Sequence, residues 1–156
     1  LLGAAANSDG HDMVAPLSLG AIEVMRQALD DAGLRPEDIE YVNAHGTSTP
    51  QGDPSEAAAM REVFGAHQPW ISSTKSLTGH AIGAAGSLEA IYTIVMMREG
   101  FLAPSVNLAP DTIDPECDRL RFVLDCPNTI SVRTAISNSF GFGGTNACLV
   151  LRRWED

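Results

Sequence analysis

Residues 71–86, ISSTKSLTGHAIGAAG, constrain the fold of this chain more than any other stretch. A short run of Ile, Ser and Thr, typical of a strand end, passes through three glycines into an apolar helix. Between them lie Lys75 and His80, five residues apart. Because such groups are costly to desolvate, a lysine and a histidine at the entrance to a buried helix favour a chemical role. The same segment also fits a Gly-rich loop with the side chains of Lys75 and His80 on the surface.

Strand and helix patterns alternate along the rest of the chain. Apolar periodicity predicts helices over residues 17–33 and 84–97 and a third that begins at Asp53. For the third helix, Asp53 is predicted as N-cap, Pro54 as the first helical residue and Glu56 as part of an approximate capping box. Strands are predicted over residues 1–6, 39–43, 70–73, 120–124, 134–138 and 147–151. This alternation predicts an α/β layered fold with a mixed sheet.

The helix predicted over residues 84–97 is apolar nearly all round, which is typical of a helix buried between layers. Glu89 is the exception within this run. Its carboxylate either lies on an exposed stripe or is a buried acid with a partner. Both interpretations fit the pattern.

The charge balance argues against two classes of partner. Ten basic and twenty acidic residues give a net charge of −10, which disfavours nucleic acid and anionic membranes. No apolar run approaches the roughly 18 residues that a membrane-spanning helix requires. We therefore expect neither nucleic acid nor membrane as a partner.

Three cysteines, Cys117, Cys126 and Cys148, are an odd number without the spacing of a disulfide framework. They favour a reducing, cytoplasmic location. The chain opens with LLGAAA, shows no signal peptide, and begins as if a strand were already in progress. We therefore interpret the sequence as a piece of a longer protein.

Polar loops follow several of the predicted strands. His45 follows one strand, Lys75 and His80 follow the next, and residues 140–146 follow a third. Ligands of open α/β sheets gather at the carboxyl ends of strands, so we expect these loops to converge. Two neutral imidazoles aimed at one carbonyl oxygen can donate hydrogen bonds to a forming enolate, and a nearby ammonium adds positive potential. The paired glycines within residues 140–146 allow a close approach of the backbone to a ligand.

Other site types fit less well. The segment GFGGTN precedes a strand, whereas a dinucleotide-binding fingerprint precedes a helix. A zinc site on His45 and His80 lacks an obvious third ligand, so no metal is expected. The G-x-S-x-G motif of serine hydrolases is absent, as is a P-loop. None of the three cysteines lies in the context of a nucleophile.

Three segments carry a specific resemblance: NAHGTSTPQGD at residues 43–53, STKSLTGHAIGAAG at 73–86 and NSFGFGGTN at 138–146. In this order and spacing they resemble the signature segments of the carboxy-terminal half of β-ketoacyl-acyl carrier protein (ACP) synthases. HDMVAP, REVFG and GFLAPSVN resemble most the type I synthases of dissociated fatty acid synthesis. The resemblance covers nearly the whole chain.

The resemblance implies that residues 1–156 form the carboxy-terminal half of a thiolase-like fold, with a mixed five-stranded sheet layered with helices. It implies decarboxylative Claisen condensation of malonyl-ACP with an acyl chain carried on a cysteine. It also implies a homodimer in the full enzyme and no cofactor of its own, since phosphopantetheine is carried by the ACP.

The resemblance also assigns roles at the centre of the site. His45 and His80 match the histidines that assist malonyl decarboxylation and hold the thioester carbonyl. Lys75 matches the lysine that supports His80 and the electrostatics of the site. Glu89 matches a buried structural acid.

Further roles concern the approach to the site. Thr47 and Thr49 match threonines that hydrogen-bond the phosphopantetheine arm. Phe142 matches a gating phenylalanine whose backbone N–H helps to form the oxyanion hole, with Phe140 and Gly143 beside it.

One departure from the family concerns the nucleophile, whose cysteine belongs to the amino-terminal half. We therefore expect this chain to be inactive without a partner half that bears that cysteine. An alternative is a non-catalytic partner that resembles a chain-length factor. Another is a polyketide or aryl-polyene ketosynthase subunit, since the residues that line the acyl tunnel belong mostly to the other half.

Overall fold

The computed structural model describes residues 1–10, 12–13, 17–125 and 130–154. Within them, six strands form one mixed sheet in the order β1-β6-β5-β2-β3-β4. The strands are β1 (Gly3–Ser8), β2 (Tyr41–Asn43), β3 (Trp70–Ser72), β4 (Arg121–Phe122), β5 (Thr134–Gly141) and β6 (Thr145–Arg152). The expected count of five strands is wrong, because all six strand patterns of the sequence pair into the same sheet.

The directions in which the strands pair determine where a ligand site can lie. Strands β3, β2 and β5 run parallel as neighbours, and β4 extends them at the edge. Strands β5, β6 and β1 are joined by antiparallel pairing. The carboxyl ends of β2, β3 and β5 therefore meet at one edge of the sheet, which is where ligands of such sheets gather.

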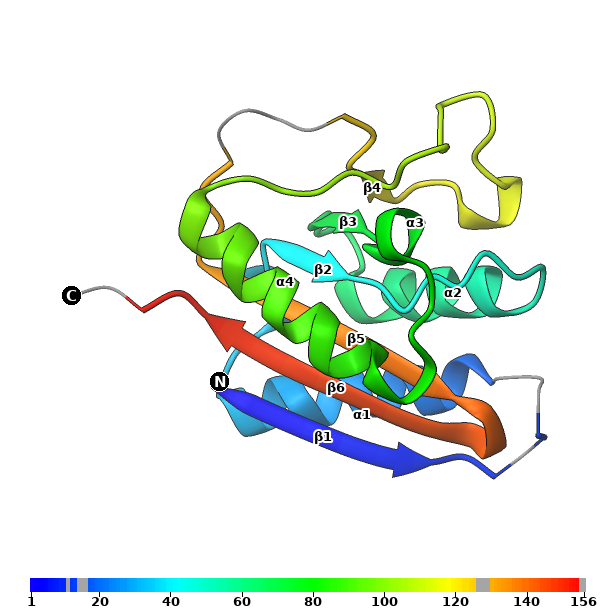
Figure 1. The fold of residues 1–156 in the computed structure, drawn as a ribbon. Coiled ribbons are helices and arrows are strands. Elements are labelled where there is room, and N and C mark those ends of the chain that lie inside the picture. Colours follow the sequence, from blue (N-terminus) through cyan, green and yellow to red (C-terminus); the bar gives the residue numbers. More distant parts are fainter. Residues whose placement is uncertain (11, 14–16, 126–129, 155–156) are drawn as a thin grey trace.

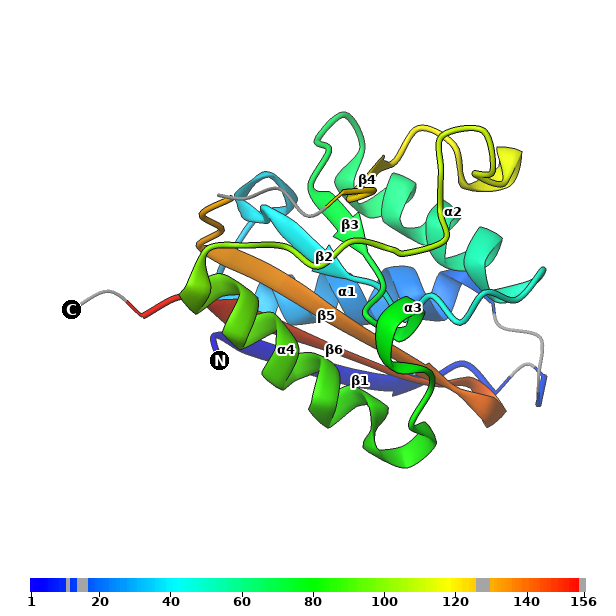
Figure 2. The same cartoon turned by 45° about the horizontal axis from the view of Figure 1, so that its top comes forward.

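Helices cover both faces of the sheet, so the molecule has three layers (Figure 1). The helices are α1 (Ser18–Ala32), α2 (Gly52–Phe64), α3 (Lys75–Thr78) and α4 (Ala85–Glu99). The tilted view shows α4 on the face opposite to α1 and α2 (Figure 2). The larger part of the core lies between α1, α2 and the sheet, and a second cluster lies under the carboxyl end of α4.

Helix α1 follows the predicted pattern closely. Val24, Met25 and Ala28 are fully buried against the sheet. The helix ends at Gly33, which has the left-handed conformation with φ of 64° and donates its N–H to helical carbonyls. A glycine adopts this conformation without the steric cost of a side chain, so the predicted stop is confirmed.

Helix α4 differs from the prediction. Its inner face buries Thr93 and Met96, whereas Ile91, Ile94 and Val95 are exposed on the outer face. The helix is therefore covered on one side by the described residues rather than buried between two layers. An all-round apolar pattern predicts that both sides of a helix are buried, but it does not identify the residues that bury the second side.

The start of α2 also differs from the prediction. The helix begins at Gly52 after Gln51, so Asp53 is not its N-cap. Instead, Asp53 Oδ1 accepts hydrogen bonds from the backbone N–H groups of Ser48 and Thr49. The carboxylate of Glu56 points into the protein and forms no capping box. Both acids therefore accept hydrogen bonds from the backbone of the loop that precedes the helix.

Candidate active site

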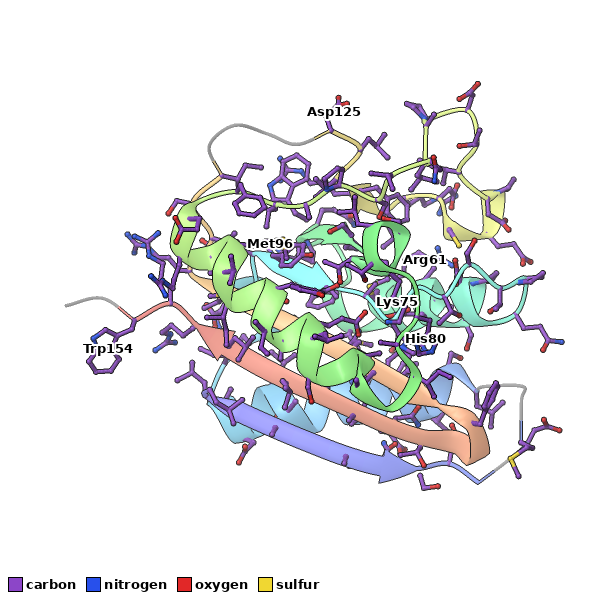
Figure 3. The ribbon with its side chains drawn as sticks, in the orientation of Figure 1. Arg61, Lys75, His80, Met96, Asp125 and Trp154 are labelled. Atoms are coloured by element: carbon purple, nitrogen blue, oxygen red, sulfur yellow. The ribbon has the colours of Figure 1, made fainter. Side chains whose placement is uncertain are left out.

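Three chain segments carry the site to the edge where the parallel strands end. His45 lies two residues after β2, Lys75 begins α3 after β3, and Phe140 lies near the end of β5. Lys75 and His80 are both on the segment that joins β3 to α4 (Figure 3), and the charges of both act on His45. The loops that the sequence places at strand ends therefore meet in space.

The two imidazoles lie next to each other. Their ring centroids are 5.5 Å apart and their planes are nearly perpendicular, at 87°. The ring of Phe140 lies on another side of His45, at 5.8 Å between centroids. At this separation both histidines can reach one small group placed between them, such as a thioester carbonyl.

His45 is held in the neutral form. Burial lowers its pKa from 6.5 to about 3, and the charges of Lys75 and His80 act in the same direction. Its Nδ1 is buried and has no hydrogen-bond partner among the described residues. A neutral imidazole can donate a hydrogen bond to a developing negative charge without first losing a proton.

His80 is exposed, and a backbone contact sets its tautomer. The N–H of Ile82 donates to Nδ1 of His80 at 3.1 Å. In the neutral ring the proton therefore resides on Nε2, which is free to donate it. Ile82 has φ of 50°, a left-handed conformation that is costly for a β-branched residue. Local strain thus accompanies the contact that orients His80.

Lys75 and Glu89 form a buried ion pair between α3 and α4. Burial raises the pKa of Glu89, and the hydrogen bond and charge of Lys75 oppose that shift. Of the two interpretations of Glu89, the buried acid with a partner is confirmed. The pair keeps an ammonium group close enough to act on the charge state of His45.

A polar network beside this ion pair joins three elements. The side-chain amide of Asn43, at the end of β2, donates toward Thr93 Oγ1 at 3.1 Å and the carbonyl of Glu89 at 3.3 Å. It also contacts Thr74 Oγ1, just before α3, at 3.4 Å. The strand that precedes His45 is thereby connected to the helix that carries Glu89.

Glu56 is a site residue that the sequence interpretation missed. Its carboxylate is buried and accepts hydrogen bonds from the backbone N–H groups of His45 and Gly46, both at 2.9 Å. The only local signal was its place in the first turn of a helix, and that signal fits a cap equally well.

Thr47 and Thr49 lie on the turn that follows His45. Their hydroxyl oxygens are 3.4 Å apart, and Thr49 Oγ1 also accepts the backbone N–H of Gly52. Thr49 is exposed and Thr47 is half-buried, so solvent reaches both side chains.

The last loop separates its two phenylalanines. Phe140 packs beside His45, whereas Phe142 is 80% exposed in the turn between β5 and β6. The N–H of Gly143, which has φ of 77°, donates to the carbonyl of Met13 at 2.9 Å. In this arrangement that amide is therefore occupied and not directed at a ligand.

The described cysteines do not supply a nucleophile. Burial raises the pKa of the Cys117 thiol to about 11 and that of the Cys148 thiol to about 12. Both are therefore protonated and unreactive at neutral pH. Cys126 lies outside the described residues.

Neither a metal centre nor a membrane span is found in the described part of the chain. No group of three or more His, Cys, Asp or Glu side chains is placed there to hold a metal ion. In the same residues, no helix has the length and apolar character needed to cross a bilayer.

The fold and the two-histidine site define a class, the ketosynthases of the thiolase-like fold, of which this chain is the carboxy-terminal half. The sequence model of one protein family, the β-ketoacyl synthase carboxy-terminal domain, matches residues 1–109. The chain belongs to this family.

Relatives and solved structures agree with this assignment. The chain is 48% identical over its full length to 3-oxoacyl-(acyl-carrier-protein) synthase 1 of Escherichia coli (strain K12). It is 43% identical to a 3-oxoacyl-(acyl-carrier-protein) synthase 2 of Coxiella burnetii. It superposes on a β-ketoacyl synthase from Burkholderia phymatum with a TM-score of 0.93 and 42% identity over 99% of this chain. The ishigamide ketosynthase/chain length factor gives a TM-score of 0.93 at 36% identity.

The chain spans only part of these proteins. It covers 37% of the Escherichia coli protein, 38% of the Coxiella burnetii protein and 37% of the Burkholderia phymatum chain.

Proposed function

We propose that this chain supplies the His45, His80 and Lys75 part of the active site of a β-ketoacyl-ACP synthase. In this proposal the intact protein condenses malonyl-ACP with a cysteine-bound acyl chain, with loss of CO2, in fatty acid elongation. The observation that carries the proposal is the pair of imidazoles 5.5 Å apart beside a buried ammonium–carboxylate pair. The identity to 3-oxoacyl-ACP synthases supports the same reaction.

The geometry suits the proposed chemistry. The malonyl thioester carbonyl accepts hydrogen bonds from the two histidines, and Nε2 of His80 carries the proton because its Nδ1 is occupied by an acceptor contact. The bond between the malonyl α-carbon and its carboxylate breaks, which releases CO2 and leaves an enolate. The N–H donors stabilise the negative charge on the enolate oxygen as it forms.

The second half of the reaction forms the carbon–carbon bond. The enolate carbon attacks the acyl thioester carbonyl, and collapse of the tetrahedral intermediate releases the cysteine thiolate. The backbone N–H of Phe142 is proposed to face that oxyanion, and Phe142 itself to gate access to it. Its exposed side chain, beside Gly143, suits a segment that moves when substrate arrives.

The ACP is the proposed partner for substrate delivery. Thr47 and Thr49 offer solvent-accessible hydroxyl groups on the turn that carries His45, and a phosphopantetheine arm is proposed to pass them. A related solved structure is described as a type II polyketide synthase ACP in complex with its ketosynthase. No cofactor of the chain itself is part of the proposal.

The cysteine nucleophile is proposed to come from an amino-terminal half of the same protein. Two observations support a missing half: the described thiols have raised pKa values, and the outer face of α4 exposes Ile91, Ile94 and Val95. The proposal includes a homodimer of the full-length protein in the cytoplasm. Free thiols at Cys117 and Cys148 agree with that location.

Two alternatives remain distinguishable by experiment. Similarity to the ishigamide ketosynthase/chain length factor favours a polyketide pathway or a non-catalytic partner as the second candidate. The presence of both histidines and the lysine in one cluster argues for catalysis, because a non-catalytic partner needs none of them.

The test uses the intact protein that contains these residues. Release of labelled CO2 from malonyl-ACP is measured for the wild type and for His80→Ala, together with acyl transfer from acyl-ACP to the protein. We expect His80→Ala to reduce decarboxylation about 10²-fold to 10⁴-fold and to leave acyl transfer largely intact. Normal condensation by this variant would remove the proposed role of His80, and a wild type that releases no CO2 would favour the non-catalytic alternative.

A further inference from the structure

The carboxylate of Glu56 connects α2 to the backbone at His45. Oε1 accepts the N–H of His45 and Oε2 accepts the N–H of Gly46, each at 2.9 Å. Oε1 also receives the side-chain amide of Asn138, on β5, at 3.3 Å. Every one of these donors is neutral, and Glu56 takes part in none of the ion pairs within the described residues. A carboxylate buried without a cation and bonded to two successive amides is suited to hold a backbone in place.

Among the described residues, no hydrogen bond holds Nδ1 of the His45 imidazole, and this nitrogen is buried. Its ring neighbours are Phe140 and His80, both in edge or tilted contacts. The direction of the ring therefore depends on the backbone from which it projects.

That backbone is held from two sides. The His45 turn, residues 44–49, faces Glu56 on one side and Ser73 on the other. Ser73 Oγ donates to the carbonyl of Gly46 at 2.9 Å. A Cβ added at Gly46 would lie 2.7 Å from the Cβ of Ser73, so the turn is pressed against the segment that leads into Lys75. Rotation of the peptide unit between residues 45 and 46 would break the contact of the Gly46 N–H with Glu56, and rotation of the next peptide unit would break the contact of the Gly46 carbonyl with Ser73.

We propose that Glu56 is a positioning residue: its buried carboxylate holds the His45 turn so that the imidazole stays within reach of the substrate carbonyl. The catalytic consequence rests on the proposed function, whereas the holding of the turn does not. A carboxylate is required because both of its oxygens accept hydrogen bonds. A glutamine would present one NH2 group to a backbone N–H and leave that buried donor unpaired.

The first test measures residue-resolved amide hydrogen exchange in the intact protein. In Glu56→Gln we expect exchange at His45 and Gly46 to accelerate about 10-fold to 100-fold, with the rest of α2 unchanged. Glu62→Gln is the matched control, because Glu62 lies on the same helix, is exposed and forms a surface ion pair with Arg26. Unchanged exchange at both amides would overturn the proposal.

A second variant guards against loss of folding. Glu56→Asp keeps the charge but withdraws the carboxylate by one methylene group. We expect faster exchange at the same two amides and a smaller increase than in Glu56→Gln. Wild-type exchange in Glu56→Asp would show that the turn does not depend on a carboxylate at the distance that Glu56 provides, and would also overturn the proposal.

The kinetic test separates positioning from general stability. For Glu56→Gln we expect kcat to fall about 10-fold to 100-fold, KM for malonyl-ACP to stay within about twofold, and acyl transfer to be retained. Wild-type kcat per folded molecule, despite faster exchange at the turn, would contradict positioning for catalysis. If the wild type releases no CO2, the proposed function fails, and amide exchange alone decides whether Glu56 holds the turn.

Discussion

The His45 turn and the His80 loop, residues 79–84, each carry a histidine of the candidate site, but different kinds of contact hold the two side chains. His45 projects from a turn that a buried carboxylate and a serine hold from two sides. His80 projects from an exposed loop in which one amide, that of Ile82, contacts its ring. His45 has a pKa lowered to about 3, mainly by burial. The orientation of His45 therefore depends on contacts with other elements, whereas that of His80 depends on the backbone of its own loop.

The two histidines therefore differ in how many contacts restrain the backbone that carries them. A tightly packed turn has little freedom, so the position of His45 is decided when the core forms. An exposed loop bordered by glycines can move, so the position of His80 depends on a local hydrogen bond and on the strained residue that provides it. The two histidines should therefore respond differently to substitutions around them.

We expect the largest effect at Lys75, whose charge acts on His45 and which begins the segment that continues to His80. Lys75→Met removes the ammonium and leaves Glu89 buried without its partner, so we expect turnover to fall about 10²-fold or more. We expect the free energy of unfolding to fall by about 3–5 kcal/mol. Steady-state condensation and urea unfolding of the intact protein measure both quantities. The double variant Lys75→Met/Glu89→Gln is the control: it should recover stability and not turnover, and near-wild-type rates would make Lys75 structural only.

A pair of glycine substitutions compares the packing of the two regions. Gly46 has φ of 36°, and an added Cβ would meet the Cβ of Ser73 at 2.7 Å, whereas nothing lies within 4 Å of a Cβ at Gly83. We expect Gly46→Ala to lower the free energy of unfolding by about 2–4 kcal/mol. Gly83→Ala should change it by less than about 0.5 kcal/mol. Equal effects in denaturant titrations would contradict the contrast between a packed turn and an open loop.

The contact that orients His80 can be removed without touching its ring. Ile82→Pro deletes the N–H that donates to Nδ1 and cannot adopt φ of 50°, so we expect kcat to fall about tenfold. Ile82→Gly keeps the N–H and adopts the left-handed conformation freely, so it should retain activity. Comparable kcat values for the two variants would show that this amide does not orient His80.

The effect that is smallest at neutral pH is on the pH dependence of stability, and it grows only as the pH falls below the ordinary histidine pKa. The folded chain keeps His45 neutral down to about pH 3, whereas the unfolded chain protonates it below pH 6.5. Between these values the unfolded state binds more protons, so this residue lowers the free energy of unfolding as the pH falls from 6.5 toward 3. His45→Gln should show a shallower loss in this window, measured by unfolding at successive pH values. Parallel curves for the two proteins would indicate that His45 titrates normally when folded.

Much of the fold follows from local patterns in the sequence. The strand runs and the stop at Gly33 are set by side-chain periodicity and by glycine geometry, which act over a few neighbouring residues. The placement of His45, Lys75 and His80 at strand ends follows from the same patterns. Their convergence then follows because the carboxyl ends of parallel strands share one edge.

The partners of the polar groups were decided only by the tertiary structure. Glu56 has the sequence context of a helix cap, yet it accepts amides from a turn ten and eleven residues earlier. The sequence context of Glu89 fits both an exposed and a buried position, and the packing of α4 places it in a buried ion pair with Lys75. The amide of Gly143 donates to Met13, which is distant in sequence. Local periodicity determines which element forms, but a buried polar group takes whichever partner the packed layers bring to it, because leaving it unpaired is costly.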